Sequence, residues 1–268
     1  MLVRPARFLY SFHLVMLTYN KERTCLLRKV HMGCLSELMK RHHGIEIDEG
    51  QERLLMDDLH AIMDVNKTMN LTRILSEEGG IVLHLEDSLT GLPFVNDAPE
   101  GLYGDLGTGG GFPGIPLCIM TGRQTLLVDS VKKKVAALEG VAKEIGIGER
   151  VGVYGGRIED LAIERKGDFS VLTARALSSL SSLMELASPL LRKRGRLVCY
   201  KAQPSEDEVE NALGIQELVG LRLECDQAFC LSDGSTRRIF VFEKTGAPRI
   251  KLPRRNGLAQ KDPLRPRP

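Results

Sequence analysis

The stretch that decides the fold reads LYGDLGTGGGFPG and runs from residue 102 to residue 114. It opens with a short apolar run, reaches the acidic residue Asp105, and then places glycines at positions 107, 109, 110 and 111. The run GIPLCIMT follows directly and is helix-like. A strand, a glycine turn and a helix in this order form a cradle for a nucleotide, because glycine permits a positive φ and a close backbone approach. The start of such a helix also presents unpaired N–H groups to a polar ligand.

Asp105 indicates which nucleotide this cradle would take. A carboxylate at the end of the strand would repel a pyrophosphate, but it can bind a cationic amino-acid head group. Asp105, Gly107, Gly109 and Gly111 spell D-x-G-x-G-x-G, a pattern that favours S-adenosylmethionine over NAD. We therefore expect S-adenosylmethionine as the cofactor, with S-adenosylhomocysteine as its product.

Strands and helices alternate after the glycine turn. Apolar patterning predicts strands at 125–129, 151–156, 168–176 and 195–202, and helices at 131–146, 179–191 and 205–213. This order predicts an α/β fold with a parallel sheet and helices on both faces. Two further strands, at about 221–227 and 237–244, have no helix between them and should pair antiparallel. Before the glycine turn we expect an amphipathic helix from Asp48, its cap, to about Asn66. A second helical stretch is expected over 77–95, with its end near Pro93.

Charge is strongly segregated along the 268 residues, although the net charge is only +2. Residues 1–44 carry +6 and residues 244–268 carry +7, so the segment between them carries −11. An acidic body with basic ends indicates contact with a polyanion through the termini. The alternative is that the basic ends only keep the protein soluble. Apolar residues make up 43% and charged residues 27% of the chain, as in an ordinary globular protein.

Localisation and domain organisation follow from the same survey. The apolar stretch FLYSFHLVMLTY at 8–19 is too short to span a bilayer and lacks a small-residue cleavage site, so we expect neither export nor a membrane anchor. The six cysteines form no C-x-x-C pair, which indicates reduced thiols in the cytoplasm and no metal site. We divide the chain into a basic segment 1–44, with Met32 as a candidate initiator, a helical subdomain 45–100, a cofactor-binding domain 101–246 and a basic tail 247–268.

Several candidate site residues follow the predicted strands, because ligands of open α/β sheets bind outside the carboxyl ends of the strands. Asp129 ends the second strand and could accept both ribose hydroxyls, or simply cap the next helix. Ile158 and Glu159 follow the third strand, where adenine contacts are expected, with a solvated acid as the alternative for Glu159. Arg175 ends the fourth strand beside the expected reaction centre, and Phe112 packs against either the cofactor or the core.

Two further patterns bear on the chemistry. His84 and Asp87 lie three residues apart on one helical face, and a structural hydrogen bond is favoured there over a general acid/base pair. TARAL stands at 173–177, where methyltransferases of amino groups carry N-P-P-Y. This difference points away from methylation of an exocyclic amine.

Seven segments together resemble one family, the bacterial small-subunit (16S) ribosomal RNA guanine-N7 methyltransferases, also called RsmG or GidB. The resemblance covers about residues 45–264. Leu85 and Glu86 depart from the apolar pair expected there, and Leu252 replaces a usual aromatic residue. The matching segments are NLTRI (70–74), HLEDSL (84–89), GDLGTGGGFPGIPL (104–117), LLVDSVKKKVAAL (126–138), GRIEDL (156–161), TARALSSL (173–180) and PRIKLPRRNGLAQKDPL (248–264).

The resemblance implies a seven-stranded class I S-adenosylmethionine-dependent methyltransferase (Rossmann-like) sheet with a small helical N-terminal extension. It also implies that Gly107, Phe112, Ile158, Glu159 and Arg175 contact the cofactor. The implied substrate is a guanine of 16S ribosomal RNA or of the small ribosomal subunit, with no obligate protein partner. Guanine N7 has a free lone pair, so in-line attack needs no obligate general base.

Basic residues are the candidates for contacts with the RNA. Arg175 and Lys201 are candidates for holding the target guanine, and four residues of the tail would bind phosphates: Arg249, Lys251, Arg254 and Arg255. Two other classes remain as alternatives. One is an NAD-dependent oxidoreductase, and the other is a non-catalytic ribosomal-RNA-binding assembly factor on a methyltransferase fold.

Overall fold

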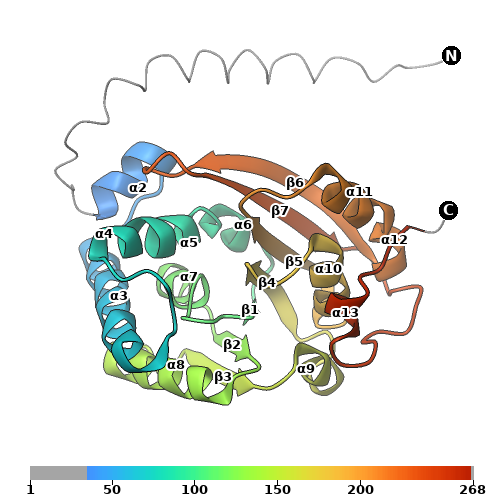
Figure 1. Ribbon diagram of the computed structural model, residues 1–268, viewed down its shortest axis with the longest axis horizontal. Helices are drawn as coiled ribbons and strands as arrows, with labels where there is room; N and C mark the ends of the chain where they lie inside the picture. Colours follow the sequence, from blue (N-terminus) through green and yellow to red (C-terminus); the bar gives the residue numbers. More distant parts are fainter. Residues whose placement is uncertain (1–34, 267–268) are drawn as a thin grey trace, which may run out of the picture.

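The computed structural model describes residues 35–266. Within this range seven strands form one sheet in the order β3-β2-β1-β4-β5-β7-β6 (Figure 1). β1 to β5 run parallel, whereas β7 pairs antiparallel with both β5 and β6, which confirms the predicted pairing of the last two strands. The strands are β1 (Leu102–Leu106), β2 (Thr125–Asp129), β3 (Val151–Gly155), β4 (Phe169–Arg175), β5 (Leu191–Lys201), β6 (Leu221–Cys230) and β7 (Thr236–Lys244).

Helices cover both faces of this sheet, as the alternating pattern predicts. One face is covered by α7 (Gly114–Thr121) and α8 (Lys132–Glu144), which have α3 (Glu49–Met69) packed outside them. The other face carries α9 (Ile158–Glu164), α10 (Leu180–Ala187), α11 (Glu206–Gly214) and α12 (Gln216–Val219). The remaining helices are α2 (Leu35–His43), α4 (Glu77–Gly80), α5 (Asp87–Leu89), α6 (Leu92–Asn96) and α13 (Leu258–Lys261).

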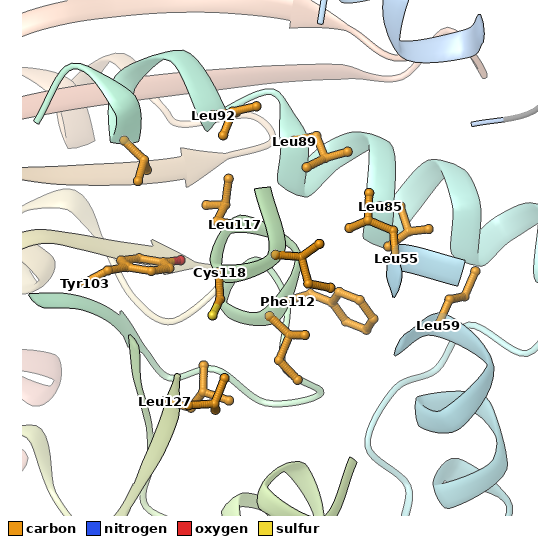
Figure 2. Close-up of a cluster of buried hydrophobic side chains, with 14 of the residues drawn as sticks. Leu55, Leu59, Leu85, Leu89, Leu92, Tyr103, Phe112, Leu117, Cys118 and Leu127 are labelled. Carbon is orange, nitrogen blue, oxygen red and sulfur yellow. The ribbon is translucent and has the colours of Figure 1, made fainter. Parts of the chain in front are cut away.

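The N-terminal helices pack onto the first face through a continuous apolar cluster. Figure 2 shows Leu55 and Leu59 of α3 gathered with Leu85 and Leu89 around Phe112, which follows the glycine turn. Leu55, Leu59, Leu85 and Leu89 are fully buried. Burial of a leucine side chain contributes about 1.5–3 kcal/mol, so this cluster fixes the N-terminal helices against the glycine turn.

Helix α3 begins where the sequence places its cap. The Asp48 carboxylate accepts the Gln51 N–H at 2.8 Å, and the Gln51 side chain accepts the Asp48 N–H at 3.1 Å. This reciprocal pair is a capping box. The helix ends at Met69, three residues beyond the predicted end, with Asn70 in the left-handed conformation as its C-cap.

The predicted second helix, 77–95, is interrupted in the structure. A π-helical segment, η2 (Ile81–Glu86), separates α4 from α5, and a turn at Thr90–Gly91 precedes α6. Pro93 therefore lies in the first turn of a new helix and not at a helix end, so that prediction is wrong. Proline is tolerated in the first turn because its missing N–H would have no partner within the helix.

Two predictions about the chain as a whole are limited by the described range. Met32 and most of the predicted basic segment lie outside the described residues. Among the residues that the structure describes, no helix is long and apolar enough to cross a membrane.

Candidate active site

The glycine turn after β1 adopts the conformation that its sequence requires. Gly107, Gly109 and Gly111 have φ values of +71°, +57° and +92°, a region that side chains with a Cβ rarely adopt. A Cβ on Gly107 would also lie 2.6 Å from the Leu177 side chain, which follows β4. The turn is thus pressed against the chain that leaves β4, and only glycine fits there.

The buried Asp105 side chain stabilises this turn through hydrogen bonds. Its side chain is fully buried, and its two oxygens accept the Gly114 N–H at 3.1 Å and the Thr173 hydroxyl at 2.7 Å. Burial raises the pKa of this carboxyl, and the hydrogen bonds oppose that shift. The carboxylate therefore joins β1 to α7 and β4, and the structure does not place it in the cleft where sequence reasoning expected a head group.

A cleft of about 170 Å³ opens at the carboxyl ends of the strands. Asp129 lines it, and its two oxygens accept the Gly109 N–H at 3.1 Å and the Val131 N–H at 2.9 Å. Both predicted roles are therefore compatible with its position, because the carboxylate holds the start of α8 and also faces the cleft. The residues that line the cleft are Gly107, Val128, Asp129, Ser130, Gly156, Arg157, Ile158, Glu159, Ala176, Leu177, Leu186 and Gln260.

Ile158 and Glu159 line the same cleft at the start of α9. Glu159 is only 4% exposed and accepts the N–H of Gly257, a residue of the C-terminal tail, at 2.6 Å. It is therefore not a solvated acid at a helix start. The C-terminal tail thus contacts the Glu159 carboxylate through the Gly257 N–H.

Arg175 is held in place by the N-terminal helices. Its guanidinium donates to the Leu83 carbonyl and to Asp87, both at 3.0 Å, and is only 16% exposed. Arg237 of β7 lies 3.2 Å from the other oxygen of Asp87. The predicted pairing of His84 with Asp87 is thus replaced by a cluster in which Asp87 holds two arginines.

Phe112 belongs to the core. It is 4% exposed, and its ring stacks on His84 with the centroids 4.3 Å apart, while the Arg175 guanidinium lies 6.0 Å from its centroid. Of the two predicted roles, the packing favours the structural one. Phe112 connects the glycine turn to the segment that fixes Arg175.

His84 is not suited to proton transfer at neutral pH. Burial and the nearby Arg175 lower its pKa to about 4, so its imidazole is neutral. Its Nε2 lies 2.8 Å from the Thr72 hydroxyl, in the NLTRI segment. The structural hydrogen bond that the sequence favoured is present, but its partner is Thr72.

The other predicted basic residues fall into two groups. Lys201 pairs with Glu208 at 2.7 Å, Arg254 forms a bidentate pair with Glu185, and Arg249 makes an exposed pair with Glu217. Lys251 and Arg255 are exposed, and no described residue pairs with them. Exposed ion pairs contribute only about 0–1 kcal/mol, so Arg249 is easily released, whereas Arg254 is firmly held.

Sequence reasoning named four of the twelve residues that line the cleft and missed eight, among them Ala176, Leu177 and Gln260. Ala176 has a φ of +54°, in the left-handed region, and turns the chain back over the cleft after Arg175. TARAL marks this position in the sequence. No signal in the sequence points to Gln260, because only the folded tail brings it to the strand ends.

Comparisons with known proteins agree with this architecture. A family model described as rRNA small subunit methyltransferase G matches residues 51–220. Ribosomal RNA small subunit methyltransferase G of Streptococcus equi subsp. zooepidemicus (strain H70) is 35% identical over 208 residues, which are 76% of this chain and 87% of that protein. The protein of the same name from Streptococcus pyogenes serotype M5 (strain Manfredo) is 31% identical over 226 residues, 82% of this chain and 94% of that protein.

Among solved structures, the [4+2]-cyclase SpnF superposes with a TM-score of 0.52 at 14% identity, over 73% of this chain and 96% of that chain. This likeness shows the fold alone, since a cyclase shares it. The sequence matches, and not the fold, identify the chemistry. They confirm the family resemblance, the class of enzyme, a methyltransferase, and the cofactor, S-adenosylmethionine.

Proposed function

Because this chain belongs to the rRNA small subunit methyltransferase G family, we propose that it transfers a methyl group to N7 of a guanine in 16S ribosomal RNA. The observation that carries this proposal is the cleft at the strand ends, which the glycine turn, Asp129 and Glu159 line, together with Arg175, which the N-terminal helices hold at the end of β4. The fold alone would leave the substrate open.

The residues of the cleft fit S-adenosylmethionine. Gly107 lines the cleft with backbone alone, Asp129 offers carboxylate oxygens to ribose hydroxyls, and Ile158 offers an apolar surface to adenine. The Glu159 side chain holds the tail through the Gly257 N–H. When bound, the cofactor supplies an electrophilic methyl group.

The groups near Arg175 favour a substrate that loses no proton. Asp87 is paired with two arginines, and His84 is neutral with a pKa of about 4. N7 of guanine has a free lone pair, so its methylation requires no general base. Catalysis then rests on orientation, which contributes roughly 7–11 kcal/mol in well-aligned systems.

Arg175 is the candidate for holding the target base. It has five N–H donors, and one nitrogen is engaged by Leu83 and Asp87. Its remaining donors match guanine O6, one of the two atoms that arginine contacts most often on this base, and a contact to O6 alone leaves N7 free to attack. Lys201 can take this role only if it leaves Glu208.

RNA phosphates would be bound by the exposed cations of the tail. Lys251 and Arg255 have no described partner, and Arg249 pairs only with the exposed Glu217. These three side chains are therefore available to a polyanion. Arg254 is already neutralised by Glu185.

Mass spectrometry of small-subunit RNA from cells with and without this gene tests the reaction. We expect one N7-methylguanine to disappear without the gene, and unchanged N7-methylguanine would refute the proposal. Loss of methylation that the purified protein and S-adenosylmethionine do not restore on small-subunit particles would indicate an assembly factor.

Binding by the purified chain tests the site. S-adenosylhomocysteine at about 100 times its dissociation constant should stabilise the protein by about 2.7 kcal/mol, and NAD should not. Asp129→Asn should weaken this binding. Asp168→Asn is the matched control, because Asp168 is exposed, lies just before β4 and, among the residues that the structure describes, pairs with Arg165 alone. Stabilisation by NAD alone would indicate an oxidoreductase.

A further inference from the structure

The C-terminal tail lies against the cofactor cleft. Figure 1 shows α13, in red, beside α10, and the two helices are in contact. The Ser182 hydroxyl of α10 donates to the Ala259 carbonyl of α13 at 2.6 Å. Asn256 and Gly257, just before α13, bond to Asp160 at 3.0 Å and to Glu159 at 2.6 Å. The tail thus crosses from α10 to the start of α9, on the side where the adenine is expected.

One arginine holds this arrangement together. The Arg254 guanidinium donates to both oxygens of Glu185, at 2.7 and 2.6 Å, and to the carbonyl of Asp262 at 2.7 Å. Glu185 is only 2% exposed, so the pair is shielded from water on one side. Bidentate arginine–carboxylate pairs are among the strongest side-chain hydrogen bonds. Arg254, which precedes α13, therefore links Glu185 of α10 to Asp262, which follows α13.

Gln260 is the residue of α13 that reaches the cleft. It lines the cleft together with Asp129, Ile158 and Glu159, and it is otherwise exposed, with no hydrogen-bond partner among the described residues. An amide offers a donor and an acceptor side by side, which match the edge of adenine.

We propose that the segment Arg254–Asp262 is part of the cofactor site, in which Gln260 reads the adenine edge and Arg254 is the positioning residue that holds the segment through Glu185. This inference rests on the proposed function, because it takes the cleft to be the site of S-adenosylmethionine. It gives Arg254 a different role from Lys251 and Arg255, although all three are tail cations.

Titration calorimetry of the full chain with S-adenosylhomocysteine tests the proposal. Removing one hydrogen-bonding group weakens binding by about three- to tenfold, and we expect a loss in this range for Gln260→Ala and for Arg254→Gln. Arg222→Gln is the control, since Arg222 is an exposed arginine of the edge strand β6, outside the tail and the cleft. Its affinity for S-adenosylhomocysteine should equal that of the unchanged protein.

A second ligand separates recognition from a merely structural effect. S-inosylhomocysteine replaces the adenine amino group with an oxygen and should bind the unchanged protein more weakly than S-adenosylhomocysteine does. Gln260→Ala should lose most of this preference, whereas the Arg222→Gln variant should keep it. Gln260 is exposed, so its substitution leaves the fold intact even if Arg254→Gln unfolds.

The outcomes are distinguishable. If the unchanged protein does not bind S-adenosylhomocysteine, the proposed function fails. If it binds, and Gln260→Ala retains both the affinity and the preference for adenine, the role of the tail is overturned while the proposed function stands.

Discussion

Replacing Asp58 with asparagine should stabilise this protein, and increasingly so as the pH rises. Asp58 lies in α3, is fully buried, and has no hydrogen-bond partner for either carboxylate oxygen among the described residues. Burial raises its pKa well above the ordinary value of 3.8. In the unfolded chain the carboxyl loses its proton above that ordinary value, whereas in the folded protein it keeps it.

The sign and size of the effect follow from proton linkage. Between the two pKa values the unfolded state binds fewer protons, so the free energy of unfolding falls by about 1.4 kcal/mol for each pH unit. Asparagine has nearly the same shape and stays neutral. The stabilisation by Asp58→Asn should therefore be larger at pH 6 than at pH 5, by at most about 1.4 kcal/mol.

Urea unfolding of both proteins at pH 5 and pH 6 measures this difference, and contributions from other titrating groups cancel. Asp57→Asn is the matched control, because Asp57 is the neighbouring residue on the same helix and is exposed. Asp57→Asn should not stabilise the protein as Asp58→Asn does. A stabilisation by Asp58→Asn that does not change between pH 5 and pH 6 would show that Asp58 is ionised in the folded protein and would refute this reasoning.

Three further outcomes are expected. The pKa of His84 is lowered to about 4 in the folded protein, against 6.5 in the unfolded chain, so the free energy of unfolding should fall by about 2 kcal/mol between pH 7 and pH 5. Urea unfolding of His84→Gln should show a smaller fall over this range. An equal fall would contradict the lowered pKa. Gly107→Ala should cost about 1–3 kcal/mol in unfolding experiments, because alanine would take a positive φ and lie against Leu177, and an unchanged stability would show that the turn relaxes. The double variant Lys251→Gln and Arg255→Gln should reduce the slope of log affinity for single-stranded RNA against log salt concentration by about 1.4. Filter binding at several salt concentrations measures this slope. An unchanged slope would exclude these residues from the RNA interface.

The regular part of the fold could be predicted from the sequence because its determinants are local. The helix after the glycine turn, Gly114–Thr121, and the strand Thr125–Asp129 have the predicted bounds. Each is a short apolar run bounded by glycine or charged residues, so neighbouring residues decide where it begins and ends. The stretch 77–95 could not be predicted in this way. Its π-helical segment, which contains the buried His84 and Glu86, depends on partners elsewhere in the chain.

The candidate site was predicted in part. Asp129, Ile158 and Glu159 line the cleft, because parallel strands bring their carboxyl ends to one edge of the sheet. The partner of each charged group could not be predicted, since a sequence displays donors and acceptors without showing which of them meet. Arg254 looked like any other cation of a basic tail, and only its contact with Glu185 separates it from Arg255.

The sequence by itself determined the glycine turn, the order of strands and helices, the cofactor and the family, because these depend on backbone conformation and on patterns over a few residues. Only the tertiary structure decided that Asp105 braces the turn through Thr173, 68 residues away, and that Glu159 holds Gly257, 98 residues away. Buried polar groups must find hydrogen-bond partners as the chain closes around them. Those partners come from whichever segments the packing of the core brings alongside.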